Sequence, residues 1–315
     1  MLKTIIIRVV LGLLTLWAVS VLIFAATEVL PGDVASAILG QGATPETLAV
    51  FRHELGLDRP SYIRYFEWFF NALHGDLGIA MTNKRVIVEV LAPRLANTLF
   101  LAGYAALIAI PTSVVLGIVA AINEGKFIDR FVNIISLMTI SVPEFFIAYV
   151  LILYLAVQFE VFPSLSTVFP EMGLLDKIYI TALPAFTLTM LVMAHMLRMT
   201  RTSVLSIMSQ PYIEMAFLKG LPKWRVVVQH AFPNALAPII NVIALNLAYL
   251  IVGVVVVEAV FVYPGLGQLM VDAVSKHDVP VVQACGLIFA SAFILLNMTA
   301  DILAIMSNPR LRHPR

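Results

Sequence analysis

Charged residues are scarce in this sequence of 315 residues, since they make up only 12% of it. A soluble domain has roughly a quarter of its residues charged, so the composition excludes an ordinary water-soluble protein. The single cysteine, Cys285, excludes an intramolecular disulfide and a cysteine-based metal cluster, and its apolar neighbours indicate a buried thiol. The net charge of +1 comes without a basic cluster, which argues against a nucleic-acid partner.

Motifs of catalysis are missing as well. The sequence has no Gly-x4-Gly-Lys-Ser/Thr loop, because Gly125-Lys126 lacks the upstream glycine and continues into Phe127. It has no His/Glu pair at the spacing of zinc ligands and no serine in a nucleophile elbow. We therefore expect no enzyme activity, no metal site and no cofactor on this chain. ATP hydrolysis is therefore not expected on this chain.

Hydrophobic runs dominate what is present, with 61% hydrophobic residues and a mean hydropathy of +0.96. A helix needs about 20 apolar residues to cross a membrane. Six stretches satisfy this length, at residues 9–26, 96–122, 131–159, 180–197, 235–257 and 281–306. The predicted fold class is an all-α polytopic membrane protein with six transmembrane helices and both termini on one side.

The first apolar stretch has a second interpretation. Lys3 and Arg8 precede it, and Phe24-Ala25-Ala26 has the small residues of a signal-peptide cleavage site. The run is longer than the usual signal-peptide core, which favours a retained first span.

The basic residues predict which side the termini face. With the N-terminus inside, the two short outer loops carry only Lys177 and Lys276. The inner segments carry Lys3, Arg8, Lys126, Arg130, Arg198, Arg201, Lys219, Lys223, Arg225, Arg310, Arg312 and Arg315. Because short cytoplasmic loops hold the excess of lysine and arginine, both termini are expected in the cytoplasm.

The segment after the first span, residues 31–94, is too long for a simple linker. Thr44-Pro45-Glu46 begins a predicted helix, and Leu57-Asp58-Arg59-Pro60 follows it as a stop. A second helix is aromatic-rich, as suits the membrane–water boundary, and contains Tyr62, Tyr65, Phe66, Trp68 and Phe69. We divide the chain into a first span (1–30), an extracytoplasmic cap (31–95) and a core of five further spans (96–315).

A polar interruption at residues 209–238 separates the fourth and fifth apolar stretches. Ser209 is expected to cap a short helix with Pro211 in its first turn, and Gly220 has the place of a left-handed residue that ends it. Pro222 opens a second helix, whose predicted apolar stripe is Trp224, Val227, Val228 and Ala231. A loop that only joins two spans needs fewer residues, so this hairpin is expected to dock on a partner.

The pattern Glu214-x-Ala216, followed by Gly220 and then Pro233, resembles the EAA loop of ABC-importer permeases. It departs from that pattern at Met215, where the family commonly has alanine. The resemblance implies that the short helix inserts into a cytoplasmic ATPase and transmits its movement. Within a coupling loop at residues 203–233, the expected coupling residues are Tyr212, Glu214, Met215, Ala216, Phe217, Lys219, Gly220 and Pro233. The alternative is an interfacial amphipathic hairpin without a partner.

Two of these residues have a predicted physical role. Glu214 lies early in the short helix, where the dipole favours a carboxylate, and nearby basic groups are its expected partners. Gly220 permits the chain reversal, because a side chain at positive φ would be strained.

Residues of the cap narrow the resemblance to the first permease of a peptide/nickel-type pair. They are Leu30-Pro31-Gly32-Asp33, the stretch 55–60 and Gly75-Asp76-Leu77-Gly78, and the tail Asn308-Pro309-Arg310 is similar to the family's Asp-Pro-Arg. The resemblance implies a multi-pass subunit of the bacterial inner membrane that binds lipid and a sister permease as a heterodimer. It also implies two cytoplasmic ATPases that hold ATP and Mg, and an extracytoplasmic substrate-binding protein. Peptides, nickel, opines and sugar conjugates remain open as substrates.

Few ionisable residues lie within the apolar stretches. Glu144, after Pro143, either lines the translocation pathway or pairs structurally, and Asn241 and Asn246 suit interhelical hydrogen bonds or a pathway wall. Glu258 is expected to be solvated at the outer boundary, and Asp301 to pair with a basic residue at the inner rim. Gly265-x-Gly267 is interpreted as a tight outer turn, because no strand precedes it and a third glycine is missing.

Two other functional classes stay open. An ATPase-independent secondary transporter or channel would need an ion-coupling residue, for which Glu144 is the candidate. A non-transporting scaffold would have no substrate at all. Uptake that survives ATP depletion would favour the first alternative, and purification without ATPase partners would favour the second.

Overall fold

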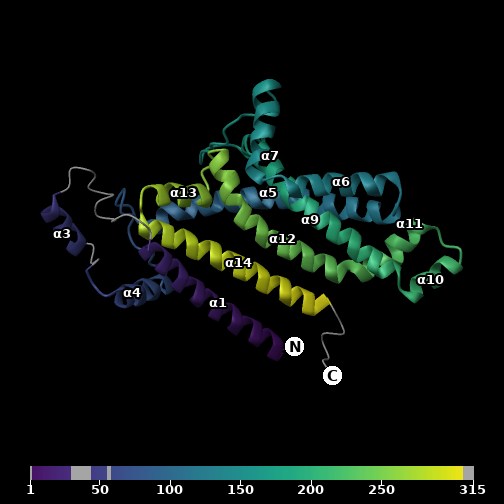
Figure 1. Cartoon of the computed structure of the whole chain (residues 1–315), viewed down its shortest axis with the longest axis horizontal. Helices are drawn as coiled ribbons and strands as arrows, with labels where there is room; N and C mark the ends of the chain where they lie inside the picture. The colour runs from purple at the N-terminus through teal and green to yellow at the C-terminus, as the bar shows by residue number, and fades with distance from the viewer. Residues whose placement is uncertain (1, 30–43, 55–57, 308–315) are drawn as a thin grey trace.

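The structure is a computed structural model that describes residues 2–29, 44–54 and 58–307 (Figure 1). Its regular elements in these ranges are helices, and one isolated pairing joins Ile79 and Val86. Before the third apolar stretch lie α1 (Leu2–Val29), α3 (Pro45–Glu54), α4 (Ser61–Leu73) and α5 (Ile87–Ile122). The third stretch and its sequel form α6 (Phe127–Ser141), α7 (Glu144–Leu151), the π-helix η1 (Ile152–Gln158) and α8 (Leu174–Ile180). The remaining elements are α9 (Ala182–Met208), α10 (Pro211–Leu218), α11 (Lys223–Val226), the π-helix η2 (Val227–Ala231), α12 (Phe232–Val260), α13 (Leu266–Ser275) and α14 (Val279–Ser307).

Five helical segments of the described chain are long and apolar enough to cross a membrane, at Ile5–Val29, Ile87–Ile122, Ala182–Met208, Lys223–Val260 and Val279–Ile302. They coincide with five of the predicted stretches, although α5 begins before residue 96 and includes Pro93. A sixth span is present only if α6 and the helix that follows it are counted together.

The third predicted span is not one helix. α6 and the helical segment Glu144–Gln158 meet at an angle of 104°. α6 has 15 residues, which gives about 22 Å of helix, less than the roughly 30 Å of the hydrocarbon layer. Pro143 explains the break, because the residue before a proline is pushed out of the helical region, and Val142 has an extended conformation with ψ 131°. Figure 1 shows α7 leaving the bundle sideways.

The core of the bundle lies between α5, α9 and α12. Ala105, Ala109, Leu188 and Val254 are among its fully buried residues. Small residues allow a close approach, since a Cβ on Gly117 of α5 would lie 2.8 Å from Thr200 of α9. α1 stands outside this core: only 6% of its most apolar window is buried, and it packs on α14 and α4.

The two ends of the bundle carry different elements. α3, α4 and α13 lie at one end, and α10 and α11 lie at the other (Figure 1). α1 begins and α14 ends toward the α10 end. There, Arg8 and Asp301 form an ion pair at 2.7 Å, which confirms the predicted pairing of Asp301. The motif residues 30–33, the start of the stretch 55–60 (residues 55–57) and the tail at 308–310 lie outside the described residues.

Candidate functional site

The short helix α10 begins at Pro211, as predicted, but the residue at its N-cap position differs from the prediction. Pro211 occupies the first turn, where its missing N–H needs no partner. The N-cap position belongs to Gln210, whose backbone is extended. The prediction of a Ser209 cap is wrong, because the Ser209 hydroxyl donates to the Ser206 carbonyl at 2.9 Å and closes the end of α9 instead.

α10 has one anchored face and one open face. Ile213 is fully buried and Ala216 nearly so, in a cluster with Val204 of α9, Val226 of α11 and Ala121 of α5. The opposite face leaves large apolar side chains uncovered, with the most exposed at Tyr212, Met215 and Leu218 and a smaller exposed fraction at Phe217. A helix held by one stripe that exposes another apolar stripe has the pattern of a docking surface.

Gly220 ends this helix as the sequence predicted. It has φ +79°, in the left-handed region, and its N–H donates to the Phe217 carbonyl at 2.8 Å. A Cβ at this position would meet no atom within 4 Å, so the backbone conformation, rather than space, requires glycine. Pro222 then precedes α11, and its carbonyl accepts from the N–H groups of Arg225 and Val226. Lys219, which directly follows α10, and Pro233, in the first turn of α12, are both exposed.

The predicted apolar stripe of the second helix is half wrong. Val227 and Ala231 are buried as expected, but Trp224 is 57% exposed and Val228 is exposed, while Val226 takes a buried place. Trp224 and Val226 lie in α11, so the buried stripe already differs there, and η2 adds to the difference because a π-helix has more residues per turn than an α-helix. α-Helical spacing therefore gave the wrong register here.

Glu214 lies in the first turn of α10, where a carboxylate is favoured by the helix dipole. Its side chain is exposed, and within the described chain no ion pair of this carboxylate is found. The expectation that nearby basic groups hold it is therefore wrong. Arg225, one of those groups, donates to Gln229 at 2.9 Å instead.

An ion pair that the sequence did not predict joins α6 and α9 near the α10 end. Arg201 donates to both carboxylate oxygens of Asp129, at 2.6 and 2.8 Å. The same carboxylate accepts from the Gly125 N–H at 2.9 Å and from the Asn133 amide at 2.8 Å. The Asp129 side chain is only 5% exposed, so these four donors compensate its desolvation. We call this group the inner ion pair.

At the other end, Glu258 is fully buried, which corrects the prediction that it is solvated. Its carboxylate accepts from the Thr98 hydroxyl at 2.6 Å and from the N–H groups of Gly267 and Gln268 in the first turn of α13. This explains the glycines of the outer turn: a Cβ on Gly265 would lie 2.1 Å from the Glu258 side chain. We call Glu258 and its three donors the outer carboxylate cluster.

Tyr263 extends this cluster toward α5. Its hydroxyl donates to the Asn97 carbonyl at 2.8 Å, and the Asn97 amide donates to the Pro264 carbonyl at 3.0 Å. Burial raises the pKa of the Tyr263 hydroxyl, so it stays a neutral donor over the whole physiological range. The outer turn is therefore fixed to α5 through both side chain and backbone.

The candidate pathway residues do not converge. Glu144 is the first residue of α7 and is half-buried. Its carboxylate lies beside Gly253 of α12, since a Cβ added to this glycine would be 3.3 Å from it. Asn246 is buried, and its amide donates to the Val242 carbonyl of its own helix at 2.8 Å, not to a neighbouring helix. Asn241 is half-buried, five residues away, and falls on a different face of α12 from Asn246. In the described part of the chain, no group of three His, Cys, Asp or Glu side chains could hold a metal ion.

Comparison with known proteins gives the family. The description "Binding-protein-dependent transport system inner membrane component" matches residues 113–313, and the N-terminal description of such membrane components matches residues 1–102. A protein of Brucella abortus (strain 2308) named as a peptide transport system permease is 36% identical over 306 residues, 97% of this chain and 98% of its own length. The glutathione transport system permease protein GsiC of Escherichia coli (strain K12) is 35% identical over 309 residues, 98% of each chain. These matches confirm the family resemblance that the hairpin and cap residues carry. The chain belongs to the inner membrane components of binding-protein-dependent transport systems.

Proposed function

We propose that this chain is the translocation subunit of an ATP-driven importer, and that cytoplasmic ATPases move it through α10. The observation that carries the proposal is the division of α10 into two faces. Ile213 and Ala216 anchor it in the core, while Met215 and Leu218 stay open, at 55% and 74% exposure. An uncovered apolar stripe at the water-facing end of a membrane protein needs a partner to cover it.

The packing around α10 suggests how its movement reaches the spans. The cluster that buries Ile213 and Ala216 also contains residues of α5, α9, η2 and α12. α10 is joined to α9 by the two residues Ser209 and Gln210. A displacement of α10 therefore moves α9 and α12 together. Because the inner ion pair joins Arg201 of α9 to Asp129 of α6, the movement of α9 also reaches α6.

The assembly and substrate follow from the family membership as proposals. We infer a heterodimer with a sister permease, two ATPases that bind ATP and Mg, and an extracytoplasmic binding protein that delivers substrate. Both termini and α10 would face the cytoplasm, and the cap the opposite side. Because the similar proteins are named for peptide and glutathione transport, peptides or peptide-like solutes are the proposed substrates.

A wall of the pathway is proposed on the exposed face of α12. Leu245, Tyr249 and Val252 are exposed there at helical spacing, and Asn241 falls on the same face. Glu144, at the break between α6 and α7, is a second candidate. The hydrogen bond of Asn246 to its own helix supports a packing role for this residue rather than contact with substrate.

The test of coupling is a charge on the open face of α10. Met215→Glu leaves the buried face intact, so the subunit is expected in the membrane at its normal level. The ATPases should no longer co-purify with it, and uptake should fall by about tenfold or more, since a buried unpaired charge costs several kcal/mol at an interface. Leu175→Glu, on the highly exposed Leu175 of α8 away from α10, is the matched control. Unchanged uptake and co-purification in Met215→Glu would remove α10 from the mechanism.

One observation favours the secondary-transporter alternative. Glu144 is half-buried, and among the described residues its carboxylate makes no hydrogen bond or ion pair. An ion-coupling carboxylate has this property. Uptake measured after ATP depletion, with the proton gradient intact, separates the two mechanisms: loss of uptake supports ATP-driven import, and retention supports ion coupling.

A further inference from the structure

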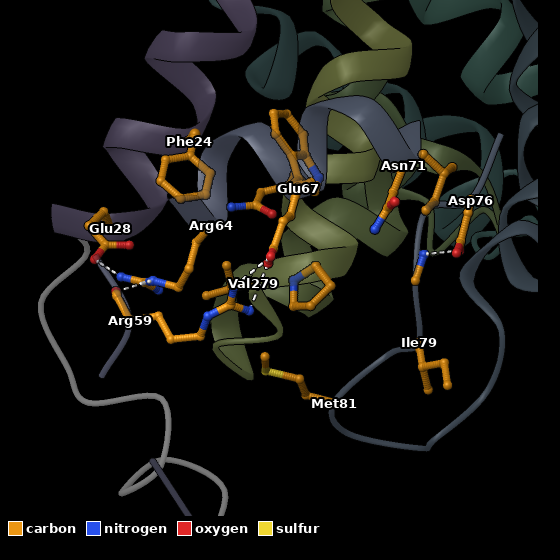
Figure 2. A pocket seen from close by; sticks show the side chains of 15 residues that line it. Phe24, Glu28, Arg59, Arg64, Glu67, Asn71, Asp76, Ile79, Met81 and Val279 are labelled. Carbon is orange, nitrogen blue, oxygen red and sulfur yellow. Dashed lines mark hydrogen bonds and ion pairs between the residues drawn. The ribbon is translucent and has the colours of Figure 1, made fainter. Parts of the chain in front are cut away.

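A cavity of about 310 Å³ lies at the end of the molecule that carries the cap (Figure 2). Its walls come from the end of α1, from α4, from the loop at residues 76–81 and from the start of α14. Asp278 holds this loop in place, because its carboxylate accepts from the N–H groups of Met81 and Thr82 and from the Thr82 hydroxyl. The cavity is therefore built by segments that are distant in sequence and fixed to one another.

Charged side chains of both signs line the cavity. Arg64 forms an ion pair with Glu28, and Arg59 donates to both oxygens of Glu67, at 2.8 and 2.5 Å (Figure 2). Asp76 adds a third carboxylate. Two cations and three carboxylates disfavour a simple anion, and the two guanidinium groups disfavour a simple cation. A ligand that carries both an ammonium and an oxyanion fits this lining.

The Arg59–Glu67 ion pair is open enough to exchange partners, while the Arg64–Glu28 pair is less exposed, at 18% and 36%. The Arg59 and Glu67 side chains are 51% and 50% exposed, and an exposed pair of this kind contributes about 0–1 kcal/mol. Glu28 uses one carboxylate oxygen for both Arg64 and Ser61, which leaves its second oxygen without a hydrogen bond in the described structure. A bound zwitterion can therefore replace or extend these pairs at little cost.

The position of α4 indicates where such a ligand comes from. Tyr62, Phe66, Phe70 and Leu73 form an exposed apolar stripe at helical spacing. A different stripe of the helix, with Arg64, Glu67 and Asn71, lines the cavity. An amphipathic helix with aromatic residues on its apolar face is suited to the plane of the membrane interface, at the depth of the lipid headgroups.

The surroundings of α1 point the same way. α1 is a candidate span that is buried over only 6% of its apolar window, so within this chain its apolar surface is open to lipid. Phe24 and Trp68 line the cavity beside the end of α1. The cavity thus opens where the headgroup of a lipid packed along α1 is expected.

We propose that this cavity binds the headgroup of a zwitterionic phospholipid, of the phosphatidylethanolamine type, from the outer leaflet. Arg64 and Arg59 face its phosphate, and Glu28 and Glu67, the carboxylates with which they pair, face its ammonium. The bound lipid fixes the cap to the outer ends of α1 and α14. This inference does not depend on coupling to ATPases.

The test is native mass spectrometry of the delipidated full-length chain, titrated with phosphatidylethanolamine or with the anionic phosphatidylglycerol. The wild type is expected to prefer phosphatidylethanolamine by about tenfold, the effect of one charge-assisted contact. Arg64→Gln should weaken binding of both lipids. Glu28→Gln removes a negative charge, so the preference should move toward phosphatidylglycerol. Lys276→Gln, an exposed basic residue outside the cavity, is the control and should match the wild type.

The shift in preference separates a binding site from a structural ion pair, because a structural loss weakens both lipids equally. Equal binding of the two lipids by the wild type would overturn the proposal, as would variants that bind like the wild type. Displacement of the lipid by the dipeptide Ala-Ala would also overturn it and assign the cavity to peptide instead.

Discussion

The two ends of the bundle each bury a carboxylate, but they satisfy it in different ways. The inner ion pair gives Asp129 a cationic partner, Arg201, from a helix 72 residues away. The outer carboxylate cluster gives Glu258 a hydroxyl of α5 and two backbone N–H groups of α13, and among the described residues no ion pair of Glu258 is found. One end is held by charge and the other by hydrogen bonds in a closely packed turn.

This difference matches the proposed roles of the two ends. A charge pair between two side chains acts over several ångströms and tolerates small movements of the helices that carry it. Bonds to backbone N–H groups, with glycines packed on the carboxylate, are lost as soon as the turn moves. We infer that the inner end, next to α10, can shift as a unit, while the outer turn keeps α5, α12 and α13 in a fixed relation.

The largest effect is expected from removing the inner charge. Asp129→Asn leaves Arg201 without its anion, which costs about 3 kcal/mol or more, as for other buried pairs that lose one partner. Glu258→Gln keeps an acceptor for most of its donors and should cost only about 1–2 kcal/mol. Thermal unfolding of the purified subunit in detergent compares them. A larger loss for Glu258→Gln would reverse the contrast between the two ends.

A smaller effect is expected from the outer glycine. A Cβ on Gly267 would lie 2.5 Å from Cα of Val255, so Gly267→Ala forces backbone to move and should cost about 1–3 kcal/mol. Gly103→Ala in α5 is the matched control, since nothing lies within 4 Å of its Cβ. That variant should be neutral or up to about 1 kcal/mol more stable. Equal melting temperatures for the two would show that the outer turn is not closely packed.

The smallest effect is expected at the exposed ion pair between α1 and α14. Arg8 and Asp301 are 49% and 37% exposed, so Arg8→Gln should cost less than about 1 kcal/mol. The same thermal unfolding assay measures it. A loss as large as that of Asp129→Asn would mean that burial does not separate the two ion pairs.

The sequence predicted the parts of the structure that local patterns determine. The length of the apolar stretches was enough to predict five spans. The positive φ of Gly220 was predicted because the chain reversal needs a left-handed residue. The two short helices of the hairpin and the turn between them followed from the positions of Pro211, Gly220 and Pro222. These features depend on neighbours in the chain, which a sequence displays directly.

Features that depend on distant partners were missed. Asp129 and Arg201 showed no motif, because the pairing of α6 with α9 decides their contact. Glu258 was expected in solvent, since nothing local indicates that Thr98 and the turn of α13 cover it. The third apolar stretch was predicted as one span, but it bends by 104° after Val142. The buried face of the second hairpin helix also differs from the predicted one, in α11 and in η2.

We propose that a motor subunit binds the open face of α10. Cys285 is the only cysteine and is buried, so Cys285→Ala gives a background for Met215→Cys carrying a photo-reactive cross-linker. In membranes of cells that express the whole transporter, the account predicts a cross-link from Met215→Cys to an ATPase subunit, identified by mass spectrometry, and none from the buried Ala216→Cys. Active uptake with no ATPase cross-link at Met215→Cys would contradict it.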